Sequence, residues 1–167
     1  MTVVSNTSPI NYLVQIGHVE LLQLRFGQVV ITSATVDELS QQSTSPCVHK
    51  FVTAPSHWIA IRRPNAIDPS LRQFGAGEQE AISLALELKA DLLIIDDKSA
   101  RRAAGRLGLA VTGTLGILKQ AAARKRVDLS KALVDLRSCG FYMSDELVDN
   151  LLEARPDNSH AGGKSNA

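Results

Sequence analysis

Five side chains that carry an amide or carboxylate oxygen stand near the expected ends of buried strands or the starts of helices. In an open parallel sheet, ligands bind beyond the carboxyl ends of the strands. These side chains could therefore act together if the fold brings those ends to one edge. The five residues are Asn6, Glu38, Glu78, Asp96 and Asp97.

Such oxygens are the hard ligands that Mg²⁺ or Mn²⁺ prefers, and these ions typically bind one or two carboxylates together with water and substrate phosphate. A bound ion can activate water and stabilise the leaving oxygen when a phosphodiester is cleaved. Carboxylates that cluster without a cation repel and raise one another's pKa. The pattern therefore favours a metal ion and phosphodiester hydrolysis.

Each of these residues also has a purely structural interpretation. Glu38 could be a solvated helix residue, and Glu78 near a helix N-terminus would interact favourably with the helix dipole in any protein. Asp97 could cap the following helix, and Asn6 could be a turn or cap residue. Two adjacent acids after an apolar strand make Asp96 and Asp97 the stronger part of the pattern.

Basic residues line one face of the helix expected after these acids, at Lys98, Arg101, Arg102 and Arg106. Such a face is usually only solvated, but beside a metal site it would also suit a phosphate backbone. The same holds for Arg62-Arg63 and for the run Arg124-Lys125-Arg126.

Composition limits the classes of protein that this chain can be. Hydrophobic residues make up 44% and aromatic residues only 4% of the 167 residues, so the core is aliphatic, as is typical of helices packed on a buried parallel sheet. The formal net charge of +1 excludes a strongly basic nucleic-acid binder, and contacts with nucleic acid would depend on local clusters. The two cysteines form no CxxC pair, and the four histidines have no metal-ligand spacing.

Short apolar runs alternate with segments of helical periodicity, which indicates a parallel sheet with crossover helices. Expected strands lie at Thr2–Ser5, Val29–Ile31, Trp58–Ile61, Asp91–Ile95 and Leu109–Val111. Expected helices begin near Thr7 or Ser8, at His18, after a Ser33 cap, near Cys47, at Ala76, after Asp97, at Thr114, at Ser130 and at Ser144. The segment Arg62–Phe74 is interpreted as an exposed connection.

Four segments together resemble the PIN-domain family, in the branch described as predicted nucleic-acid-binding proteins, which is similar to the ribonuclease toxins of VapBC-type toxin–antitoxin pairs. The segments are VVSNTSPI, GAGEQEAISLALEL, LLIIDDKSARRAAGRLGL and VTGTLGIL, and the resemblance covers roughly Thr2–Lys125. It implies a small three-layer α/β/α sandwich with a parallel central sheet, extended here by extra C-terminal helices over 126–154.

The resemblance also implies an acidic quartet around Mg²⁺ or Mn²⁺ and a metal-dependent endoribonuclease. The first acid of the quartet falls on Asn6, which has nearly the shape of Asp without its charge, so metal affinity is expected to be weaker. The second and third fall on Glu38 and Glu78, and the fourth falls on Asp97 or on Asp96. Thr112 and Thr114 match a polar rim near the site and are expected RNA contacts, together with Lys98, Arg101 and Arg102.

Family members commonly form homodimers and are inhibited by a small antitoxin protein, so RNA, an antitoxin and a second subunit are the expected partners. The first alternative is a catalytically inactive PIN fold that binds RNA or protein. The second is a receiver domain, which the absence of a later strand ending in Asp or Lys makes weaker.

The ends of the chain complete the expectations. The N-terminus lacks the features of a signal peptide, and no apolar run reaches the ~18 residues needed to span a bilayer, so a cytoplasmic location is expected. A single domain is expected over residues 1–154, followed by a disordered tail at 155–167. The last expected helix carries Leu147, Val148, Leu151 and Leu152, which could pack on the domain or on a second subunit.

Overall fold

Five short parallel strands form the centre of the computed structural model, which describes residues 1–153. The strand order is β3-β2-β1-β4-β5, and every neighbouring pair is parallel, so the expected parallel sheet is confirmed. The tail expected at 155–167 lies outside the described residues. The strands are β1 (Val3–Ser5), β2 (Val29–Thr32), β3 (Ile59–Arg62), β4 (Leu92–Ile94) and β5 (Val111–Thr112).

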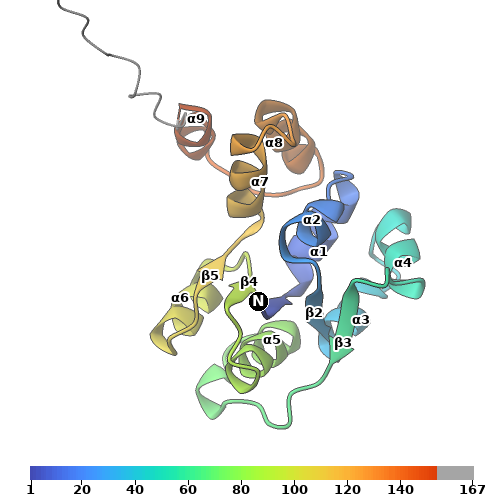
Figure 1. Ribbon diagram of the computed structural model, residues 1–167, viewed down its shortest axis with the longest axis vertical. Coiled ribbons are helices and arrows are strands. Elements are labelled where there is room, and N and C mark those ends of the chain that lie inside the picture. Colours follow the sequence, from blue (N-terminus) through green and yellow to red (C-terminus); the bar gives the residue numbers. More distant parts are fainter. Residues whose placement is uncertain (154–167) are drawn as a thin grey trace, which may run out of the picture.

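Helices connect the strands and extend the chain beyond the sheet (Figure 1). The first group is α1 (Thr7–Gln15), α2 (Glu20–Phe26), α3 (Ser33–Leu39) and α4 (Pro46–Thr53). The second group is α5 (Ala76–Glu87), α6 (Lys98–Arg106) and α7 (Thr114–Ala123), followed by α8 (Leu129–Ser138) and α9 (Asp145–Glu153). The connection before α5 contains a single 3-10 turn, η1 (Pro69–Leu71), which buries Leu71.

Alternate residues of the buried strands point to opposite faces of the sheet, as the two-residue period of a strand requires. Val3 and Ile94 join one apolar cluster with residues of α1, α2, α7 and α8. Val4 and Leu93 join a second cluster with residues of α5 and α6. The expected three-layer α/β/α sandwich is therefore confirmed, with an aliphatic core on both faces of the sheet.

Three local expectations differ from the structure. The α3 helix is capped by Thr32, whose hydroxyl accepts a hydrogen bond from the Thr35 N–H, and not by Ser33. The α1 helix begins after Asn6, which occupies the cap position although its side chain makes no capping bond to the helix. Strand β5 spans Val111–Thr112 and so begins two residues later than expected, because Leu109 and Ala110 only lead into it from the turn at Leu107 and Gly108.

The C-terminal helices lie to one side of the sheet (Figure 1). The α8 helix buries Ala132, Leu133 and Leu136, whereas α9 contacts α8 and buries no residue. Within residues 1–153, no helix combines the length and the apolar character that crossing a membrane would demand.

Candidate active site

The site forms where the strand order reverses direction between β1 and β4. The helix after β1 packs in one apolar cluster, and the helix after β4 packs in the other, so α1 and α6 leave the sheet on opposite faces. A crevice opens at such a switch point beyond the carboxyl ends of the two strands. The chain places Asn6 and Asp96 at these two ends.

Asn6 is held in the crevice by its backbone and by one side-chain bond. Its N–H donates to the carbonyl of Ile94 at 2.9 Å, which continues the β1–β4 ladder by one residue. Its Nδ2 donates to Oε1 of Glu78 at 3.3 Å. The residue is 1% exposed, and its Oδ1 has no hydrogen-bond partner within the described part of the chain.

Glu38 approaches the same crevice from α3. Its Oε1 accepts a hydrogen bond from the Gly77 N–H at 3.0 Å, and its Oε2 accepts one from the Thr7 hydroxyl. The first turns of α1 and α5 thus both donate to this one carboxylate. A Cβ on Gly77 would lie 2.6 Å and 2.7 Å from the two oxygens of Glu38, so it would displace this carboxylate from its present position.

Asp96 is held from the other side of the crevice by the start of α7. Its Oδ1 accepts from the Thr114 N–H and its Oδ2 from the Thr114 hydroxyl, both at 2.7 Å. Burial raises the pKa of the Asp96 carboxyl above its ordinary value, while the bonds from Thr114 and the charge of Arg101 act in the opposite direction. This carboxyl is therefore desolvated but well ordered.

Asp97 has a different geometry from its neighbour. Its Oδ1 accepts a hydrogen bond from the Ala100 N–H at 2.7 Å, and the residue is exposed. This is the helix-capping arrangement that its sequence position allows. Asp97 therefore satisfies the backbone of α6, whereas Asp96 faces the crevice.

The site residues form two groups. Asn6, Glu78 and Glu38 are joined through α1, α3 and α5, and Asp96 belongs to the group held by Thr114. Among residues 1–153, no three Asp, Glu, His or Cys side chains lie close enough to hold an ion by themselves. An ion here would need the free Oδ1 of Asn6 as a ligand. Its protein ligands would then all be oxygen atoms, and few of them would be carboxylates, which is a ligand set that Mg²⁺ accepts.

The expected RNA contacts differ in their distance from this crevice. Arg101 lies beside Asp96, since its Nη1 and the Asp96 Oδ1 are each 2.8 Å from the position that a Cβ on Gly113 would take. Thr114 is fully buried, and its hydroxyl already donates a hydrogen bond to Asp96. Thr112 is half-buried in β5, and Lys98 and Arg102 are exposed on α6.

Sequence reasoning did not identify three residues that shape the site. Thr7 and the Gly77 N–H hold Glu38, and no local pattern indicates bonds that join helices so far apart in the chain. Tyr12 of α1 is the third. Burial, followed by the charge of Asp96, raises the pKa of its phenol, and its ring packs edge-on against Phe141 at 4.9 Å.

Comparisons with known proteins agree with this architecture. The family model DUF3368, described as a PIN domain, matches residues 2–155. No curated protein matches the sequence. Among solved structures, a PilT N-terminus domain protein from the hyperthermophilic archaeon Sulfolobus solfataricus P2 is similar, with a TM-score of 0.56 and 24% identity over 72% of this chain and 93% of that chain. At this identity the likeness concerns the fold alone.

The contact between Gly77 and Glu38 predicts opposite effects for two glycine substitutions. Gly77→Ala is expected to lower the free energy of unfolding by about 1–3 kcal/mol, because its Cβ would push the Glu38 carboxylate away from the Gly77 N–H and the Thr7 hydroxyl that donate to it. Gly105→Ala, inside α6 with nothing within 4 Å of the new Cβ, is the matched control and is expected to raise it by roughly 0.5–1 kcal/mol. Urea unfolding of both variants measures the difference, and equal effects would contradict it.

The raised pKa of Asp96 predicts a pH dependence of stability. The folded chain binds the proton more readily than the unfolded chain, whose pKa is near the ordinary 3.8, so this group's contribution to the free energy of unfolding falls as pH rises through the folded-state pKa. Relative to Asp96→Asn, the wild type is expected to gain stability as the pH is lowered from about 7 toward about 4. Denaturation in the presence of a chelator checks this, and a flat or reversed difference would refute it.

Proposed function

The chain belongs to the PIN-domain family, whose members are generally nucleases, and from this premise we propose that it is a metal-dependent endoribonuclease of the toxin–antitoxin type. The reaction would be hydrolysis of RNA phosphodiester bonds with Mg²⁺ or Mn²⁺. The choice of RNA and of the toxin class rests on the resemblance of the four sequence segments to toxin ribonucleases.

The free Oδ1 of Asn6 is the observation that supports this proposal most. A buried polar atom without a partner costs about 1–3 kcal/mol, so such atoms are rare unless something else satisfies them. This oxygen lies at the switch point of a parallel sheet, beside the Glu78 carboxylate. A hard cation would satisfy it.

We propose that Asn6, Glu38, Glu78 and Asp96 would hold the ion, with the remaining positions taken by water and substrate phosphate. When bound, such an ion supplies an activated water and stabilises charge on the phosphate oxygens. The chain itself positions the ligands: the Thr114 N–H and hydroxyl orient Asp96, and the Gly77 N–H and Thr7 hydroxyl orient Glu38.

Arg101 is placed to act on the substrate. Its guanidinium lies beside Asp96, where it can donate to a phosphate oxygen of RNA and balance its charge. Lys98 and Arg102 on the exposed part of α6 extend this positive surface and are proposed to contact neighbouring phosphates. We also propose that Thr112 and Thr114 form a polar rim of the site.

We favour Asp96 over Asp97 as the fourth ligand because the two side chains already have different partners. Asp97 is committed to the Ala100 N–H at the start of α6. Asp96 faces the crevice and is partly desolvated, which strengthens its interaction with a cation.

A non-catalytic role is the second candidate, and Asn6 is the observation that favours it. An amide in place of the first acid removes one negative charge from the set, which lowers affinity for the ion. In that case the same surface would bind RNA or a protein without cleaving it. For either role we propose a small antitoxin protein and a second copy of this chain as partners, and the cytoplasm as the location.

Titration calorimetry with Mn²⁺ tests the metal site, with Asp96→Asn compared against Asp97→Asn. Asp96→Asn is expected to weaken binding at least about tenfold, which is about 1.4 kcal/mol. Asp97→Asn is the matched control, because asparagine caps a helix as well as aspartate does, and binding is expected to change little. Loss of binding in Asp97→Asn alone would reverse the assignment, and no binding in the wild type at millimolar Mn²⁺ would remove the metal proposal.

Asn6→Asp separates the catalytic role from the binding role. Without metal, the new carboxylate would face Glu78 where an amide now donates a hydrogen bond, so the free energy of unfolding is expected to fall by about 1–3 kcal/mol. With Mn²⁺, cleavage of single-stranded RNA is expected to rise at least about tenfold. A wild type that already cleaves as fast as the variant would exclude the binding-only role, and no cleavage by either would favour it.

A further inference from the structure

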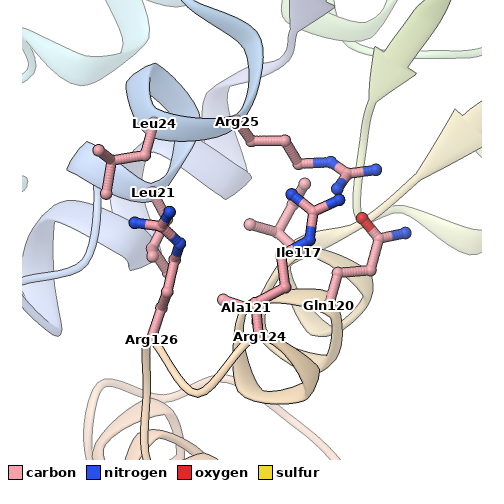
Figure 2. Close-up of a pocket in the computed structure, with 8 residues that line it drawn as sticks. All are labelled: Leu21, Leu24, Arg25, Ile117, Gln120, Ala121, Arg124 and Arg126. Carbon is pink, nitrogen blue, oxygen red and sulfur yellow. The ribbon is translucent and has the colours of Figure 1, made fainter.

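A groove with an apolar floor and a basic rim lies between α2 and α7 (Figure 2), and none of the candidate metal ligands lines it. Its floor is formed by Leu21, Ile117 and Ala121, which are 8%, 2% and 8% exposed. Leu24 stands at its edge and is 62% exposed. We call this the α2–α7 groove, and its remaining lining residues are Arg25, Gln120, Arg124 and Arg126.

Three arginines surround this groove without an acidic partner. The ion pairs within residues 1–153 are Lys131–Asp135 and Arg137–Asp145, and neither involves Arg25, Arg124 or Arg126. Figure 2 shows the guanidinium groups of Arg25 and Arg124 directed toward each other beside Gln120. Because like charges repel, such a rim favours an occupant that brings negative charge.

The α9 helix has the complementary properties. It carries four acids, Asp145, Glu146, Asp149 and Glu153, and no basic residue. Its apolar residues at 147, 148, 151 and 152 recur at helical spacing. Val148 and Leu151 pack against the core of their own chain, whereas Leu147 and Leu152 are 39% and 40% exposed. It is an amphipathic helix that its own domain covers only in part.

We propose that α9 of a second copy of this chain docks in the α2–α7 groove. The exposed Leu152 would pack on the exposed Leu24 at the edge of the groove, and the acids of α9 would pair with the arginines of the rim. Two-fold symmetry makes the exchange reciprocal, so each copy gives one helix and receives one. At 1.5 Å per residue α9 is roughly 14 Å long, about the length of the α7 helix that borders the groove.

A second copy explains the observations better than the alternatives. Within one chain, α9 lies beyond α8, on the opposite side of α7 from α2, so it does not reach its own groove in this arrangement (Figure 1). RNA would account for the arginines, but it would leave the half-exposed leucines of α9 unexplained. The acidic helix and the basic groove match in charge, and each carries an exposed leucine beside its charged residues. This inference rests on the proposed homodimer and not on the proposed nuclease activity.

A charge swap tests this interface by light scattering on the full chain, which weighs 18.0 kDa. Arg124→Glu/Arg126→Glu and Asp149→Arg/Glu153→Arg are each expected to raise the dimer dissociation constant at least about tenfold, and the chain carrying all four changes is expected to recover most of the loss. The matched control, Arg63→Glu/Arg72→Glu on exposed residues elsewhere, is expected to leave the dimer intact.

The outcomes separate this interface from the dimer itself. A dimer dissociation constant that is unchanged in both charge variants would overturn the α9 interface while leaving the homodimer in place. A wild type that stays monomeric at all concentrations would overturn both. Loss of RNA affinity in Arg124→Glu/Arg126→Glu with an unchanged mass would identify the groove as an RNA surface and also overturn the proposal.

Cross-linking tests the contact without changing any charge. Leu24→Cys and Leu152→Cys chains are mixed under mild oxidation and separated on a non-reducing gel. A disulfide-linked heterodimer is expected from the mixture and from neither variant mixed with wild type, since that control accounts for the native Cys47 and Cys139. Absence of the heterodimer from a mixture that light scattering shows to be dimeric would contradict the proposal.

Discussion

The parallel pairing of β1 with β4 is the interaction on which the rest of this structure depends. It aligns Val3, Val4 and Ser5 with Leu92, Leu93 and Ile94, and it continues through the bond that the Asn6 N–H donates to the carbonyl of Ile94 at 2.9 Å. Because β1 and β4 feed helices on opposite faces, this pairing opens the crevice. It also brings the end of β1 within reach of groups that are remote in the chain.

The ends of the strands and the helices that follow them bury polar groups that an ordinary core would not contain. Ser5, Asn6, Thr32, Thr35 and Thr114 are all buried. Most are satisfied by short local bonds, and the apolar clusters on both faces of the sheet offset the remaining cost. Among the described residues, the exception is the free Asn6 Oδ1 at the switch point, where the Asp96 carboxyl is also desolvated although Thr114 donates hydrogen bonds to it. Local violations of the packing rules that concentrate at one place are the mark of a functional site.

Asn6 also changes what the crevice needs in order to be stable. An ionised aspartate at this position would face Glu78 as a like charge, whereas the amide donates a hydrogen bond to it. The amide therefore avoids a repulsion that an ionised aspartate would bring, and it also lacks the charge that would attract a cation. Elsewhere the chain separates its charges by element, with arginines around the α2–α7 groove and acids on α9, so that a net charge of +1 conceals two surfaces of opposite sign.

The sequence by itself determined the parallel α/β fold, because short continuous apolar runs that alternate with helical periods predict buried strands joined by crossover helices. It also placed Asn6 and Asp96 at strand ends and allowed Asp97 to be a cap. Only the tertiary structure decided that β4 lies beside β1, which joins Asn6 to Glu78 across 72 residues, and that Asp96 faces the crevice while Asp97 faces its own helix. Periodicity cannot encode strand order or the direction of two adjacent side chains, since both depend on long-range packing.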